Sequence, residues 1–126
     1  MNFSGIAPVE LECYLDRPEV LIIDLREPQE YRECHIRGAV NIPFEQFWEQ
    51  CVQKPAPRRF ASLKNPRRYC DVDEGVCRQL EDYEVLLFYC GRGSHSLMVA
   101  ERMRRQGWPA LSITGGMNAL TQSHFS

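Results

Sequence analysis

Two continuous apolar runs constrain the fold of this chain more than any other feature. They are EVLIIDL at residues 19–25 and VLLFY at residues 85–89. Unbroken apolar runs of this length are typical of strands in parallel sheets that helices cover on both faces. Two shorter segments, GAVNIP at 38–43 and ALSIT at 110–114, are also predicted to contain strands. Because helix-prone segments separate these runs, the pattern predicts an α/β fold with a largely parallel sheet.

The segments between the strands have the spacing of helices. The predicted helices are residues 8–16, 27–33, 44–52, a stretch around 75–81, and 96–107. Their expected apolar sides are Val9, Leu11 and Leu15 in the first, Phe44, Phe47, Trp48 and Cys51 in the third, and Leu97, Ala100 and Met103 in the last. Gly107 is expected to end the last helix, because glycine is the usual residue just beyond a helix terminus.

Length and composition predict that residues 1–126 form a single domain. A chain of 126 residues with 44% hydrophobic residues can bury one core. The net charge of −2 favours neither a nucleic acid nor a membrane surface as partner. No run approaches the roughly 18 apolar residues of a membrane helix, and the N-terminus lacks the features of a secretion signal. We therefore expect a cytoplasmic protein.

A basic, proline-containing segment stands apart and predicts a surface insertion at residues 53–75. Residues 53–70 hold three prolines and six basic residues without an acidic one, and residues 71–84 hold six acidic residues and one arginine. A solvated loop explains this composition. A docking surface or lid near the active site is the alternative. No interleaved aromatic residues support base stacking, so we expect no nucleic-acid partner.

The six cysteines (13, 34, 51, 70, 77 and 90) include no C-x-x-C pair. In a reducing compartment most of them are expected to be buried thiols. His35 beside Cys34 could contribute to a metal site, but we expect no metal and no cofactor.

Cys90 differs from the other cysteines by its context, LLFYCGRGSHS at residues 86–96. It ends a buried strand, and a helix is expected to begin at about Ser96. Ligands of open parallel sheets bind beyond the carboxyl ends of strands. Gly91 and Gly93 allow positive φ and close backbone approach, so that successive amides can converge on an anion. The start of the helix adds positive potential, which favours a thiolate nucleophile at Cys90. Arg92, and His95 when protonated, would attract an anionic substrate.

Four segments resemble the rhodanese-like domain of sulfurtransferases. LIIDLREPQEY (21–31) is similar to the family's first strand and its Asp-x-Arg-Glu-Pro continuation, and HIRGAVNIP (35–43) to its His-Ile-x-Gly-Ala-x-x-x-Pro signature. YCGRGSHS (89–96) resembles its active-site loop, and ITGGMNAL (113–120) its terminal Gly-Gly segment. The resemblance spans nearly the whole chain apart from about residues 50–82.

The resemblance implies a central five-stranded, mostly parallel sheet flanked by helices on both faces. Cys90 would be the catalytic sulfur carrier, taking a sulfane sulfur as a persulfide from thiosulfate, 3-mercaptopyruvate or another persulfide. A thiol or protein acceptor would then remove it. The substrate-binding residues would be Gly91, Arg92, Gly93, Ser94, His95 and Ser96. Asp24 and Arg26 would support the loop, and His35 would be structural.

The active-site loop departs from the family pattern. Many single-domain members have arginine at the position of His95, whereas this chain has arginine at position 92. Gly91, next to the thiol, is closer to the loop of mercaptopyruvate-using relatives. The donor stays open as a result, and so does the pH dependence, since histidine changes charge near neutrality.

Two other functions compete with sulfur transfer. A Cys-dependent phosphatase with a Cys-x5-Arg loop would need arginine where this chain has Ser96, to clamp phosphate. A non-catalytic or redox-sensing interaction module of the same family is the second, although many such modules lack the cysteine that this chain keeps.

Overall fold

The computed structural model of the chain describes residues 5–52, 80 and 82–120. These residues form a five-stranded sheet, all of whose paired strands are parallel. In spatial order, the strands are β1 (Gly5–Ile6), β5 (Ala110–Ile113), β4 (Val85–Tyr89), β2 (Val20–Asp24) and β3 (Val40–Asn41). The predicted α/β fold with five strands is confirmed, and the four predicted strand segments each contain a strand.

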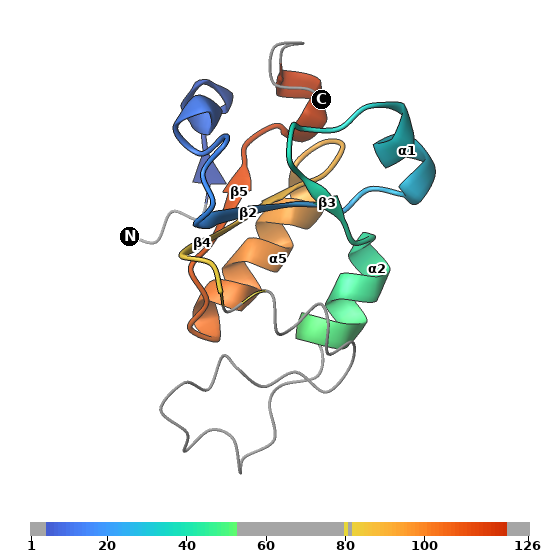
Figure 1. Cartoon of the computed structure of the whole chain (residues 1–126). Helices are drawn as coiled ribbons and strands as arrows, with labels where there is room; N and C mark the ends of the chain where they lie inside the picture. The colour runs from blue at the N-terminus through green and yellow to red at the C-terminus, as the bar shows by residue number, and fades with distance from the viewer. Residues whose placement is uncertain (1–4, 53–79, 81, 121–126) are drawn as a thin grey trace.

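Helices pack on both faces of this sheet (Figure 1). On one face lie α5 (Ser94–Arg105), α2 (Phe44–Phe47) and the π-helical turn η2 (Trp48–Val52) that continues α2. On the other lie the 3₁₀ helices η1 (Pro8–Cys13) and η4 (Gly116–Ala119). Helix α1 (Pro28–Glu33) follows β2 at the end of the sheet.

Burial on both faces explains why the strands are continuously apolar. Along β2, Leu21 and Ile23 point into the core beneath α5 and α2, while Ile22 points into the core beneath η1. Along β4, Phe88 lies on the first side and Tyr89 on the second. Because successive strand residues point to opposite faces, both cores draw on the same short segments.

The first residues of the described chain differ from the sequence prediction at β1 and in the segment around Val9. Strand β1 was not predicted, since two residues carry no periodic signal. The expectation that Val9 faces inward is wrong: its exposed fraction is 80%, whereas Leu11 and Leu15 are buried. The segment around Val9 forms a 3₁₀ helix, whose three residues per turn change which side chains share a face.

Helix α5 begins at Ser94, two residues before the predicted start. Ala100 and Met103 face inward, as predicted. Ser96, Val99, Ala100 and Met103 are its buried residues. Leu97 was expected to face inward, but 43% of its surface is exposed. A polar residue takes the inward position at 96 because it faces the Cys90 sulfur.

The insertion at 53–75 and most of the helix predicted around 75–81 lie outside the described residues. Leu80 is described, and it is buried in the core beneath α5. Within the described part of the chain, no helix is both long and apolar enough to cross a membrane.

Candidate active site

A pocket of about 310 Å³ opens at the point where the strand order reverses. Strands β2 and β4 are neighbours, with Asp24 opposite Tyr89. From β2 the chain continues outward to β3, and from β4 it continues outward in the opposite direction to β5. The loops after β2 and β4 therefore separate, and such a switch point is where open α/β sheets bind ligands. The pocket is lined by Leu25, Arg26, Glu27, Glu30, Phe44, Glu45, Cys90, Gly91, Arg92, Ser94 and His95.

Cys90 lies at this pocket directly after β4, with 5% of its surface exposed. Its sulfur accepts hydrogen bonds from the backbone N–H of Gly93 at 3.1 Å and of Ser96 at 3.4 Å. The thiol also donates to Ser96 Oγ at 3.6 Å, and that hydroxyl donates to the Gly93 carbonyl at 3.1 Å. The amides and the start of α5 thus converge on the sulfur, as the sequence predicted. Two backbone N–H groups and one hydroxyl therefore surround the sulfur.

The two glycines beside Cys90 have different roles. Gly93 has a φ of +98°, a conformation that side chains disfavour. A Cβ on Gly93 would also lie 3.0 Å from the backbone nitrogen of Gly115. Gly91 has no positive φ, and a Cβ there would meet nothing within 4 Å. The expectation that Gly91 supplies positive φ is therefore wrong, and only Gly93 is required by the backbone.

The segment after β5 supports the loop from the other side. Met117 N–H donates to the Cys90 carbonyl at 2.8 Å. Gly116 has a φ of +62°, and a Cβ on it would overlap the Cys90 carbonyl oxygen and lie 2.7 Å from the Gly91 carbonyl oxygen. The loop of Cys90 and the Gly-Gly turn thus pack backbone against backbone.

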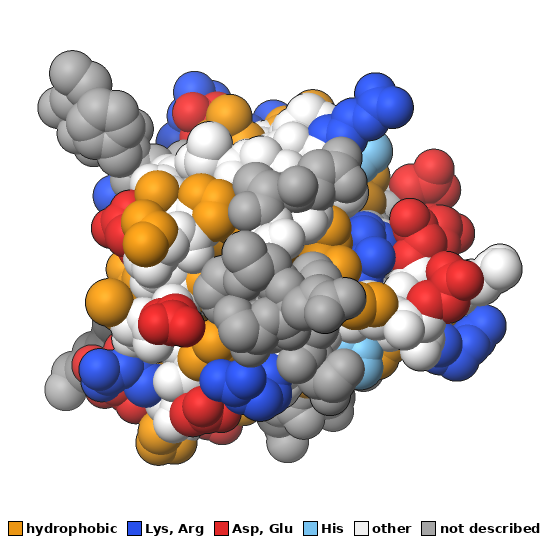
Figure 2. All heavy atoms as spheres, turned by 90° about the horizontal axis from the view of Figure 1, so that it is seen from above, with side chains coloured by type: hydrophobic (Ala, Val, Ile, Leu, Met, Phe, Trp, Pro, Cys, Tyr) orange, Lys and Arg blue, Asp and Glu red, His pale blue; other side chains and the backbone are white. Residues whose placement is uncertain are grey.

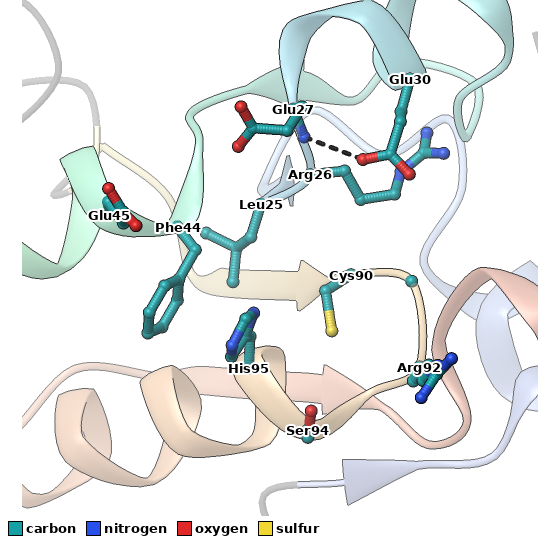
Figure 3. A pocket seen from close by; sticks show the side chains of 11 residues that line it. Leu25, Arg26, Glu27, Glu30, Phe44, Glu45, Cys90, Arg92, Ser94 and His95 are labelled. Carbon is teal, nitrogen blue, oxygen red and sulfur yellow. Dashed lines mark hydrogen bonds between the residues drawn. The ribbon is translucent and has the colours of Figure 1, made fainter.

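The remaining predicted substrate-binding residues are brought together around the thiol (Figure 3). Arg92, Ser94 and His95 are exposed and line the pocket. The ring of His95 stacks on Phe44, with centroids 4.1 Å apart and planes 11° from parallel. This pair, contributed by α5 and α2, forms an aromatic wall beside Cys90.

The two predicted supporting residues form a buried pair under the end of the sheet. Arg26 bonds to both carboxylate oxygens of Asp24, at 3.0 Å from Nε to Oδ1 and 2.8 Å from Nη2 to Oδ2. Asp24 is fully buried, and Arg26 also donates to the Cys34 carbonyl. Burial opposes the charged guanidinium, but the hydrogen bonds and charge of Asp24 keep the pKa of Arg26 above its ordinary value.

Tyr89, the residue before Cys90, is bonded to this pair, and the sequence prediction missed it. Its hydroxyl donates to Asp24 Oδ2 at 2.7 Å and accepts from the Ile36 N–H at 3.0 Å. Burial and then the negative charge of Asp24 raise the pKa of Tyr89 far above its ordinary value. The signal that could have revealed it is a phenol and a carboxylate ending two adjacent apolar strands.

The sequence prediction also missed the acidic residues that line the pocket. Glu27, Glu30 and Glu45 line it and are exposed. Glu27 and Glu30 come from the beginning of α1, where the Glu27 N–H donates to Glu30 Oε1 at 3.2 Å (Figure 3). Acidic residues at helix starts are common, so the sequence alone gave no reason to assign them to the pocket.

His35 has the contacts of a structural residue. Its ring stacks on Tyr31 with centroids 3.9 Å apart, and its Nδ1 lies 2.8 Å from the Tyr31 carbonyl oxygen. Tyr31 in turn donates to the Ala39 carbonyl. Cys13, Cys34 and Cys90 are free thiols. In the part of the chain that the structure describes, no three His, Cys, Asp or Glu residues are grouped to hold a metal ion.

Comparison with known families matches residues 7–123 to the Rhodanese-like domain. The chain belongs to the rhodanese-like domain family. The resemblance inferred from the four motifs is thereby confirmed, and the fold expected of the family is the one observed.

Curated relatives of this rhodanese-like domain include sulfur-handling proteins. It is 28% identical over 125 residues to the candidate sulfur carrier protein YrkF of Bacillus subtilis, a match that covers 95% of this chain and 54% of YrkF. It is 29% identical over 107 residues to the adenylyltransferase and sulfurtransferase MOCS3 of Drosophila persimilis, covering 82% of this chain and 19% of MOCS3. The chain thus spans about half or less of the length of these relatives.

Among solved structures, the human single-domain sulfurtransferase TSTD1 is similar along its whole length. Its TM-score is 0.61 at 23% identity, and the match covers 94% of this chain and 95% of TSTD1. This similarity establishes the shared fold.

Proposed function

We propose that the protein is a sulfurtransferase that carries a sulfane sulfur as a persulfide on Cys90. The observation that carries the proposal is the convergence of the Gly93 and Ser96 amides on a thiol that lines a pocket at the switch point of the sheet. Membership of the rhodanese-like family and similarity to sulfur-handling relatives support it.

The reaction would proceed in two displacements. The Cys90 thiolate attacks the outer sulfur of the donor, a new S–S bond forms, and the donor's bond to that sulfur breaks with its electron pair. With thiosulfate the leaving group is sulfite, with 3-mercaptopyruvate it is the pyruvate carbanion, which takes a proton, and with a persulfide it is a thiolate. An acceptor thiolate then attacks the outer sulfur and releases the Cys90 thiolate. The amides of Gly93 and Ser96 would stabilise the negative charge at the start and end of this cycle.

The other residues would act around this centre. Arg92, Ser94 and His95 would contact the donor together with Gly91, while Asp24 and Arg26 would hold the end of β2 through Tyr89. No cofactor enters the scheme. The cytoplasm, where thiols stay reduced, would be a suitable compartment.

Phosphate-ester hydrolysis fits the loop less well. Ser96 stands where a Cys-x5-Arg phosphatase would need its clamping arginine. Its hydroxyl is buried and bonded within the loop, to the Gly93 carbonyl and the Cys90 thiol.

Intact-mass spectrometry tests the proposal directly. Incubation with thiosulfate, 3-mercaptopyruvate or a small persulfide should add one sulfur, about 32 Da, to the wild-type protein and none to Cys90→Ser. Absence of the adduct with every donor, combined with equal capture of a partner protein by both forms, would favour a non-catalytic module. Cys90-dependent hydrolysis of a phosphate ester would favour a phosphatase.

A further inference from the structure

The described residues around the mouth of the Cys90 pocket carry more negative than positive charge. Glu27, Glu30 and Glu45 are exposed carboxylates that line it. Arg92 is an exposed guanidinium in the same lining. Arg26 also lines the pocket, but its charge is balanced by the buried carboxylate of Asp24, to which its guanidinium donates three hydrogen bonds. This distribution differs from the electropositive pocket that Arg92 and His95 led us to expect.

The inner wall of the pocket is aromatic and apolar. Phe44 and His95 stack against each other, and Leu25 lies beside them above the Cys90 thiol (Figure 3). Carboxylates combined with the face of an aromatic ring form an environment that stabilises an ammonium group. The same environment raises the energy of a small dianion, because three carboxylates repel it and one guanidinium attracts it.

A purely structural role for the three glutamates makes a different prediction. Glu27 and Glu30 lie at the start of α1, and Glu45 lies in the first turn of α2, where carboxylates stabilise helices. That role would affect stability alone. It would not change how fast molecules of different charge reach Cys90.

We infer, building on the proposed function, that the donor whose sulfur reaches Cys90 carries a positive group that lies among the carboxylates lining the pocket. The substrate class is a persulfide of a cationic thiol, R–S–SH with an ammonium in R, and thiosulfate is disfavoured. The Cys90 thiolate attacks the outer sulfur, the S–S bond of the donor breaks, and R–S⁻ leaves. The proton of the persulfide stays on the transferred sulfur, which gives Cys90–S–SH and R–S⁻, and no external oxidant or reductant is required.

Thiol reagents of opposite charge test the pocket's charge without relying on sulfur transfer. The probes are 2-(trimethylammonio)ethyl and 2-sulfonatoethyl methanethiosulfonate, each of which forms a mixed disulfide and releases methanesulfinate. Their rates at Cys90 are followed on the Cys90 peptide by mass spectrometry. Each rate is divided by the rate at the same cysteine in urea-unfolded protein.

The normalised rate ratio of cationic to anionic reagent should exceed one in the wild type, by about fivefold or more at low salt. It should fall towards one in Glu27→Gln/Glu45→Gln and when salt is added to the wild type. The matched control, Glu12→Gln, removes an exposed carboxylate outside the pocket and should leave the ratio unchanged. A wild-type ratio at or below one overturns the inference, and so does an equal change in the Glu12 variant.

Two donors then separate the inference from the proposed function. The persulfide of cysteamine is cationic and that of 2-mercaptoethanesulfonate is anionic, and kcat/KM is measured for each with one acceptor. The cationic donor should be favoured by about fivefold or more, with the preference reduced in Glu27→Gln/Glu45→Gln. Equal use of both donors overturns the donor preference and leaves the sulfurtransferase standing. Loading of Cys90 by thiosulfate but by neither persulfide also overturns the donor preference. Failure of both persulfides, thiosulfate and 3-mercaptopyruvate to load Cys90 overturns the proposed function itself.

Discussion

At the scale of single residues, the loop around Cys90 is held by the backbone of two glycine turns. Gly93 and Gly116 both have positive φ, and each lies against the backbone of the other's segment. The Cys90 carbonyl accepts the Met117 N–H, so the peptide of Cys90 itself is part of this contact. The orientation of the sulfur therefore depends on Gly116 and Met117, which do not line the pocket.

Substitutions at three glycines separate conformational strain from steric overlap. Gly116→Ala should destabilise the fold most, because a positive φ costs about 1–2 kcal/mol and the new Cβ also overlaps the Cys90 carbonyl. Gly107→Ala, with positive φ but no close neighbour, should show the strain alone. Gly91→Ala should be nearly neutral. Urea unfolding measures all three, and a similar loss at positions 107 and 116 would argue against the close packing.

Tyr89 gives the fold a pH dependence in the alkaline range. Its folded-state pKa is raised above the unfolded value of about 10 by burial and by Asp24, so the folded chain holds this proton more strongly. The associated stabilisation is complete below about pH 10 and is lost as the pH rises further.

Tyr89→Phe tests this linkage. The variant should be about 1–3 kcal/mol less stable at neutral pH, because the Asp24 carboxylate and the Ile36 N–H lose a buried partner. From pH 9 to 11 the unfolding free energy of the wild type should fall more steeply than that of Tyr89→Phe. Parallel pH profiles for the two proteins would contradict the assignment.

At the scale of elements, α5 combines two functions on one helix. Its first turn supplies the Ser96 N–H to the Cys90 sulfur, and Val99, Ala100 and Met103 anchor the helix to the sheet. Ser96 faces inward, and Leu97 beside it is half exposed. The position of the Cys90 sulfur is therefore coupled to the packing of the helix.

Two truncations on α5 test which of its predicted inward residues is buried. Met103→Ala should cost about 2–5 kcal/mol, since the side chain is fully buried. Leu97→Ala should cost less than about 1 kcal/mol, because the side chain already contacts water. Urea unfolding of both variants checks the difference. A loss at Leu97 as large as that at Met103 would mean that Leu97 also faces inward, as the apolar periodicity predicted.

Most elements could be predicted from the sequence because their signal is local. Strand β4 is apolar throughout and β2 is apolar except for Asp24, and α1 begins with a proline that is suited to the first helical turn. The inward positions of Ala100 and Met103 on α5 were predicted as well. The inward position of Ser96 could not be, because it depends on a contact with the Cys90 sulfur from another element. Strand β1 could not be predicted either, because its two residues are recognised as a strand only by their pairing with β5.

The residues of the candidate site also differ in whether local sequence could predict them. Cys90 and its loop could be predicted, because a strand end, two glycines and a helix start are consecutive in the sequence. Tyr89, Phe44 and the three pocket glutamates could not, since their roles arise from contacts between separate loops. Their residue types are ordinary for buried strands and helix starts.

At the scale of the whole molecule, the parallel sheet brings the loops after β2 and β4 to one edge. The loop after β4 carries the nucleophile, and the loop after β2 carries Arg26 and the acidic start of α1. The order of the strands thus assembles a thiol, a buried ion pair and a charged mouth from distant parts of the chain.

The central claim is that Cys90 carries a sulfur that can be passed on, and a single-turnover transfer tests it most directly. The protein is loaded with sulfur-34 from a labelled donor, freed of that donor, and then mixed with an excess of a thiol acceptor. We predict that the protein loses one sulfur, that about one labelled sulfur per chain appears on the acceptor, and that Cys90→Ser transfers none. Label that stays on the protein, or transfer of equal size by Cys90→Ser, would contradict the account.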